Sequence, residues 1–156
     1  MKLLLFIGVL LTPFMSYSQD FWIGDIENKT ISGPAVGNRD LTFGVKNILE
    51  ELIQERGYDL NPESTTKLSI EILYFDVQKT SVQMGAFGKN LDVTEIIFRA
   101  TLVKDGKQLK PIVAKGQAKS ISTSTLIIDQ GGQFSQANVS TALKKVCEDV
   151  LTKFEL

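Results

Sequence analysis

The chain has 156 residues, a length that fits one domain better than two. Apolar residues make up 43% of it and charged residues 22%, so it can fold around a packed core. The formal net charge is −1 and the lysines are scattered, which argues against nucleic-acid binding. The absence of histidine and the single cysteine exclude Ser-His-Asp and Cys-His catalysis, most catalytic zinc sites and an intrachain disulfide.

Residues 1–18 have the pattern of a cleavable signal peptide. A positive charge is followed by the apolar run 3–11, and Ser16 and Ser18 are the small residues that precede a cut after position 18. The apolar run is too short to cross roughly 30 Å of hydrocarbon. We therefore expect residues 19–156 to form one exported domain, in the periplasm or outside the cell, with no transmembrane segment.

The rest of the chain predicts the order strand, helix, strand, strand, strand, helix. Apolar residues recur every three or four positions in the two helical segments, and they alternate with polar ones in the strands. Asp105-Gly106 between two strand patterns predicts a type I′ hairpin. The expected segments are strand 21–27, loop 28–38, helix 41–56, and strands 67–79, 92–104 and 108–123, followed by helix 137–154.

This order predicts an α+β fold, with a mainly antiparallel four-stranded sheet and two helices packed on one face (β-α-β-β-β-α). Asp40 is expected to cap the first helix and Gly57 to end it. Pro111 lacks the backbone N–H that a central strand needs, so the last strand is expected to start at an edge of the sheet.

The strand that starts at Lys67 changes its alternation midway. Leu68, Ile70 and Ile72 share one parity, whereas the apolar residues from Leu73 onward have the other. A β-bulge explains this change, and so does a strand buried on both faces.

If helices cover one face only, the odd-parity apolar residues lie on the open face. Such a patch would mark a partner surface, whereas scattered surface hydrophobicity or a covering loop would explain it equally well. Phe87, in the apolar tip Met84–Gly88, is a further candidate for partner contact, although a simple glycine-permitted loop is favoured there. The predicted partner surface therefore comprises Leu73, Phe75, Val77, Phe87, Ile97 and Val103.

The sequence contains only weak patterns of the kinds that mark catalytic or ligand-binding sites. The glycines in 129–133 precede a helix but lack a phosphate-loop pattern, so a plain loop is expected. Cys147 is expected to be an inert core residue, and Lys144, three residues after Thr141, is expected to be solvated. A hydrolase built from carboxylates would need two of the strand acids Asp76, Asp92 and Glu95 in one cleft, and we expect these to be dispersed. The sequence thus predicts no catalytic residue, metal site or cofactor.

The stretch 41–58, which ends in Arg56-Gly57-Tyr58, resembles the first helix of the YajG-type bacterial envelope lipoproteins. The later strands, the hairpin and the last helix also match that family's order, so the resemblance covers about residues 36–156. It implies a cell-envelope protein with no catalytic residues to carry over. Proteins of this type usually have a lipidated cysteine at the cleavage site, and Ser16-Tyr17-Ser18-Gln19 contains none, so no lipid anchor is expected.

These observations favour a non-enzymatic protein of the bacterial cell envelope that acts by binding another envelope protein or a second copy of itself. The alternative is a periplasmic carrier of a small apolar or lipid-like ligand, held between the sheet and the helices.

Overall fold

The computed structural model describes residues 19–33, 36, 39–84, 87–124 and 135–156, and the side chains of all these except 81–84, 87–88 and 122–124. The predicted signal peptide, the glycine-rich 129–133 segment and the tip residues 85–86 lie outside this part. The elements in chain order are β1 (Asp20–Ser32), α1 (Thr42–Glu55), β2 (Asp59–Leu60), β3 (Lys67–Met84), β4 (Phe87–Lys104), β5 (Lys107–Gln108), β6 (Ile112–Ser124) and α2 (Gln136–Lys153).

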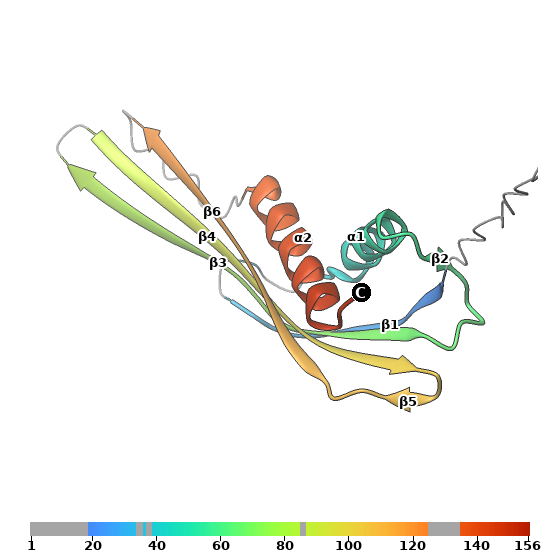
Figure 1. Ribbon diagram of the computed structural model, residues 1–156. Coiled ribbons are helices and arrows are strands. Elements are labelled where there is room, and N and C mark those ends of the chain that lie inside the picture. Colours follow the sequence, from blue (N-terminus) through green and yellow to red (C-terminus); the bar gives the residue numbers. More distant parts are fainter. Residues whose placement is uncertain (1–18, 34–35, 37–38, 85–86, 125–134) are drawn as a thin grey trace, which may run out of the picture.

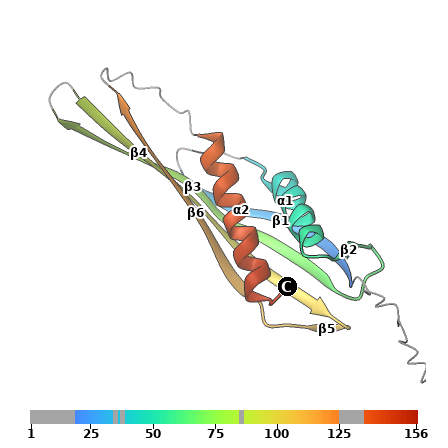
Figure 2. The ribbon, with the colours of Figure 1, turned by 45° about the horizontal axis from the view of Figure 1, so that its top comes forward.

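The strands form one six-stranded mixed sheet, and both helices lie on the same face of it (Figures 1 and 2). The strand order is β2-β1-β3-β4-β5, and β6 pairs with β4 on the same edge as β5. The helices bury their apolar stripes against the sheet in one continuous core, as predicted from their three- and four-residue spacing. The bulkiest fully buried side chains are Phe21, Phe75 and Phe98.

The sheet is not mainly antiparallel at its β1 edge, which corrects the predicted topology. β1 runs parallel to β3 on one side and to the two-residue β2 on the other. The reason is the connection through α1, which carries the chain back along the sheet, so that the next long strand starts at the same end as β1. β1 is also longer than the predicted 21–27 and takes in the first residues of the predicted 28–38 loop.

A β-bulge at Leu73 explains the change of alternation in β3. Ile72 pairs with Phe98 and Tyr74 pairs with Ile97, which leaves Leu73 without a partner on β4. Before the bulge, Ile72 and its alternate neighbours face the helices. After it, the opposite parity faces the helices, so that the helix-covered core continues along the same strand.

The hairpin between β4 and β5 forms as predicted. Asp105 has φ 50° and Gly106 has φ 73°, the two positive values that a type I′ turn requires. The predicted return strand is divided into β5 and β6 by the segment around Pro111, and β6 lies at the edge of the described sheet.

The helix ends also follow the sequence closely. α1 begins at Thr42, and its N-cap residue is Leu41 and not the predicted Asp40. The Asp40 carboxylate, one residue earlier, accepts a hydrogen bond from the Thr42 backbone N–H at 2.9 Å, which lowers the pKa of Asp40. Gly57, with φ 83°, follows the end of α1. Ser135 caps α2 by accepting from the Asn138 backbone N–H at 3.3 Å.

α2 lies directly on the backbone of β6, because the helix-facing residues of that strand are small. Ala114, Gly116 and Ala118 alternate along this face and are all buried. A Cβ atom at Gly116 would overlap the Ala142 carbonyl oxygen and approach the Val146 Cβ to 2.8 Å. The distance between the helix and the sheet is therefore set by the missing side chain at Gly116.

We expect Gly116→Ala to lower the free energy of unfolding by about 1–3 kcal/mol, because the added methyl group has to push α2 away from β6. Gly44→Ala is the matched control, since its Cβ would lie 3.6 Å from Leu143 Cδ1, an ordinary contact. A helical glycine replaced by alanine should be neutral or stabilising by up to about 1 kcal/mol. Urea unfolding followed by circular dichroism measures both, and equal effects at the two positions would contradict this packing.

Candidate functional site

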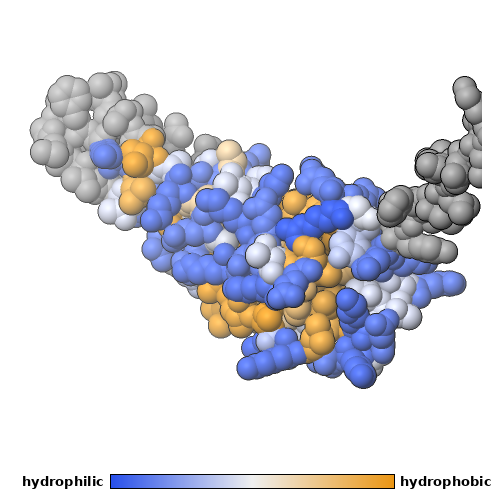
Figure 3. Space-filling view, in the orientation of Figure 1, coloured by the Kyte–Doolittle hydropathy of each residue, from blue (hydrophilic) through white to orange (hydrophobic). Residues whose placement is uncertain are grey.

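A groove of about 450 Å³ opens between the N-terminal halves of α1 and α2. Its apolar side chains come from both helices, and Phe75 of β3, itself only 1% exposed, lies at its floor. Figure 3 shows hydrophobic surface between the positions that the two helices have in Figure 1. The apolar lining is Leu41, Phe43, Ile48, Phe75, Val139 and Leu143, and polar residues that include Arg39, Asn47, Gln136 and Ser140 complete the wall.

Phe43 is the most accessible large apolar side chain of the groove. It is 76% exposed, more than any other large hydrophobic residue among the described side chains. It lies in the first turn of α1, off the stripe formed by Val45, Leu49 and Leu52, which the fold buries. An aromatic side chain left in water next to an apolar groove is a surface that a binding partner can desolvate favourably.

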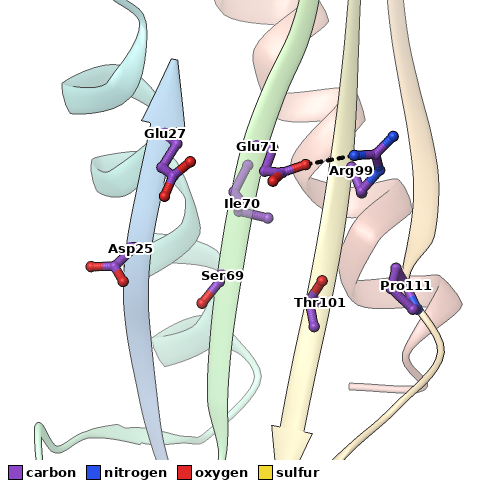
Figure 4. A pocket seen from close by; sticks show the side chains of 8 residues that line it. All are labelled: Asp25, Glu27, Ser69, Ile70, Glu71, Arg99, Thr101 and Pro111. Atoms are coloured by element: carbon purple, nitrogen blue, oxygen red, sulfur yellow. Dashed lines mark hydrogen bonds and ion pairs between the residues drawn. The ribbon is translucent and has the colours of Figure 1, made fainter. Parts of the chain in front are cut away.

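The opposite face of the sheet carries a network of charged side chains. Figure 4 looks onto this face, with the helices behind the strands. The Glu71 carboxylate accepts hydrogen bonds from Lys29 at 2.5 Å and from Arg99 at 2.9 Å, and Lys29 also contacts Glu27 at 2.7 Å. The bond from Lys29, with that from Arg99, lowers the pKa of Glu71. The opposite charges of these side chains neutralise one another. Because the pairs are open to solvent, they contribute little to the free energy of unfolding.

A shallow hollow of about 430 Å³ lies beside this network and is lined by Asp25, Ser69, Thr101 and Pro111 among others (Figure 4). Among the described residues, no group of three or more acidic or cysteine side chains is placed to hold a metal ion.

The predicted partner surface is divided by the bulge at Leu73, and this corrects part of it. Phe75 and Val77 lie on the helix-covered face, where they are 1% and 2% exposed, because the bulge reverses the parity of β3. Phe87 begins β4, but its side chain is outside the described part. The remaining members, Leu73, Ile97 and Val103, are half-buried, and their part of the predicted partner surface stays a prediction.

Two of the three strand acids come together, contrary to the expectation that they are dispersed. Asp76 on β3 is directly opposite Glu95 on β4, and both lie on the face away from the helices. Asp92 has the other parity on β4 and pairs with Lys79 and not with either acid. The sequence could not predict this pairing, because it depends on the extra residue at Leu73.

Both carboxylates of this pair are occupied by neighbouring groups. Asp76 accepts from the Val77 backbone N–H at 2.8 Å and from the Tyr74 hydroxyl at 3.2 Å, and Glu95 forms an ion pair with Lys115 at 2.9 Å. The Gly33 backbone lies so close that a Cβ there would overlap the Asp76 carboxylate. Burial, with the nearby Asp76, raises the pKa of Tyr74. This arrangement is a structural contact between the end of β1 and β3.

The hydroxyl and lysine of α2 do not form a dyad. The Thr141 hydroxyl donates to the Ala137 carbonyl of its own helix at 2.8 Å, and Lys144 is exposed. Cys147 is buried in the core, as predicted, and burial, with a contribution from Glu148, raises the pKa of its thiol to about 12.

The sequence reasoning missed the groove between the helices. Its clearest signal is Phe43, an aromatic residue that breaks the amphipathic pattern of α1 by lying off the apolar stripe. Gly44 beside it is a second signal, since a glycine inside a helix often marks a close approach to another element. The groove itself depends on how α2 lies relative to α1, which no local pattern encodes.

No protein-family model matches the chain, and no curated protein matches it. Solved structures with a similar course of the backbone include a protein from Xanthomonas campestris of the family DUF330 (13% identity, TM-score 0.49, 92% of this chain and 87% of that one). Others are a minor lipoprotein from Acinetobacter baumannii (10%, 0.47, 85% and 88%) and rare lipoprotein B from Shewanella oneidensis (7%, 0.39, 85% and 94%). These similarities assign neither a family nor a function. Neither of the two helices that the structure describes is both long and apolar enough to span a bilayer.

We expect the Cys147 thiol to be unreactive in the folded protein. With a pKa of about 12, it is almost entirely protonated at pH 8, and its burial blocks access by reagents. Ellman's reagent should therefore label the native protein hardly at all and should label one thiol per chain in concentrated urea. Rapid labelling of the native protein would show that α2 does not lie on the sheet as described.

Proposed function

We propose that the chain is an exported protein of the bacterial cell envelope that acts by binding and not by catalysis. The pattern of residues 1–18 supports export, and the resemblance of residues 36–156 to the YajG-type proteins supports a place in the envelope. The groove between α1 and α2 is the proposed docking site. Its occupant is an apolar side chain or a short apolar segment of another envelope protein.

The observation that carries this proposal is the exposure of Phe43 beside an apolar floor. Stable interfaces have a desolvated apolar centre surrounded by a polar rim. The groove has this composition, with Leu41 and Val139 on its walls and Arg39 and Gln136 at polar positions around them.

Site-specific photocrosslinking in the source bacterium tests this docking site. A photoreactive benzoylphenylalanine at position 43 should give a covalent adduct with one envelope protein, because that side chain would contact the partner. The matched control is Ile31, which is 75% exposed on β1 and does not line the groove. We expect the adduct from position 43 to disappear when Val139→Asp places a charge on the groove wall, and to remain with Val113→Asp on β6.

The crosslinked partner, identified by mass spectrometry, is then purified for a binding assay. Phe43→Ser should weaken its binding by about tenfold or more, the effect typical of an aromatic residue at the centre of an interface. Equal adduct yields at positions 31 and 43, or unchanged binding of Phe43→Ser, would contradict the proposed site.

The carrier of a small apolar ligand is the second candidate, because a volume of about 450 Å³ lies within the range of ligand sites. The walls are open to solvent, so this candidate requires the ligand to be retained during purification. Native mass spectrometry of protein purified from its own host distinguishes the two functions. We expect the mass of the unliganded chain, and an adduct that Val139→Asp removes would instead favour the carrier.

A further inference from the structure

The outer edge of β6 is closed along its first half by polar side chains of α2. Lys153 Nζ donates to the Val113 carbonyl at 2.9 Å, and Lys145 Nζ donates to the Gln117 carbonyl at 3.2 Å. Between them, the Lys115 backbone N–H donates to Asp149 Oδ2 at 3.2 Å. These backbone groups point away from β4, and covering them prevents another strand from pairing there.

The second half of the same edge, residues 119–124, extends beyond this cover. Figures 1 and 2 show β6 continuing with β3 and β4 as an arm that projects past both helices. Because outward-pointing backbone groups alternate along a strand, Lys119, Ile121 and Thr123 have the same orientation as Val113 and Gln117. None of the described residues forms a hydrogen bond with the outward backbone groups of Lys119 or Ile121. Lys119 and Ile121 therefore offer backbone groups with which another strand can pair.

The side chains of the arm differ between its two faces, and an apolar row lies on the face away from the helices. On that face the register aligns Thr80, Leu91 and Ile121 across the three strands, and Ile121 is 61% exposed at the edge. On the helix side, the adjacent row is polar and consists of Lys79, Asp92 and Ser120. The apolar row thus ends at the same edge that has unpaired backbone groups.

We propose that a second copy of this chain pairs with this edge, antiparallel and about a two-fold axis at Ile121. In this register Ile121 faces Ile121 of the second copy, and Lys119 faces Thr123. The apolar row then continues across both copies, from Leu91 to Leu91, through the two isoleucines. A two-fold contact uses the same edge of both chains, so that each copy covers this edge of the other.

Charge and steric cover disfavour the two registers centred nearer to the covered half of the edge. An axis at Lys119 would place two lysines directly opposite each other, which is destabilising. An axis at Gln117 is blocked, because Lys145 already occupies the Gln117 carbonyl. The paired segment is short, with about six backbone hydrogen bonds. We therefore expect a contact smaller than the standard interface of roughly 1,600 Å² and a dimer that dissociates on dilution.

Disulfide crosslinking tests the partner and the register together. Ile121→Cys would face itself at a Cα separation of about 5.5 Å, which suits a disulfide. Lys119→Cys is the matched control. In this register the two residues at position 119 lie four residues apart along the paired strands, which separates them by about 13 Å. The native Cys147 is buried and can remain in both variants. We expect mild oxidation to convert Ile121→Cys into covalent dimer at least tenfold faster than Lys119→Cys.

Sedimentation equilibrium gives the second measurement and needs no added cysteine. The unmodified protein should show a concentration-dependent dimer that Ile121→Lys removes and that Val113→Lys, at a 55% exposed position of the same strand, retains. A strictly monomeric protein at millimolar concentration would overturn the proposal. So would equal crosslinking rates at positions 119 and 121, or crosslinks in cells that join position 121 only to a different protein. Failure here leaves the groove between the helices untouched, because the two surfaces lie on different elements.

Discussion

The contact between α2 and the backbone of β6 at Gly116 is the interaction on which the rest of the structure depends. Most helices are held about 10 Å from a sheet by the side chains between them. Here, a strand face made of Ala114, Gly116 and Ala118 lets Ala142 and Val146 approach the strand itself. The close approach buries the apolar residues of α2 from Ala142 to Leu151, and these include the only thiol of the chain, Cys147.

The close approach of α2 to β6 has two consequences for the surface of the molecule. It brings Lys145, Asp149 and Lys153 within hydrogen-bonding distance of the outer edge of β6, so that one helix both covers the core and closes part of the edge. It also sets the N-terminal half of α2 beside α1, where the groove forms over Phe75. The two proposed contact surfaces, the groove and the second half of the outer edge of β6, are thus the places where the cover provided by α2 ends.

The sequence predicted the elements of this fold well, because local patterns determine them. The helical stripes, the Asp105-Gly106 turn, the end of α1 at Gly57 and the buried position of Cys147 all follow from spacing and from residue chemistry. The sheet was predicted less well, since pairing depends on distant segments. The parallel position of β1 follows from the crossover through α1, and this requires knowing which strands are neighbours.

The candidate site could be predicted only in small part. One extra residue at Leu73 moves Phe75 and Val77 into the core and sets Asp76 opposite Glu95, so that a single bulge accounts for both errors on this face. The groove depends on the relative position of two helices, and the sequence marks it only by Phe43.

Nuclear Overhauser contacts of Gly116 test the central packing most directly. The two Hα protons of a glycine resonate separately when its backbone is held rigidly, and one of those of Gly116 points at α2. The account predicts strong contacts from this proton to the Val146 methyl groups and to Ala142. If these contacts are absent and the Gly116 protons reach only solvent or neighbouring strands, α2 does not lie on β6, and both proposed surfaces lose their basis.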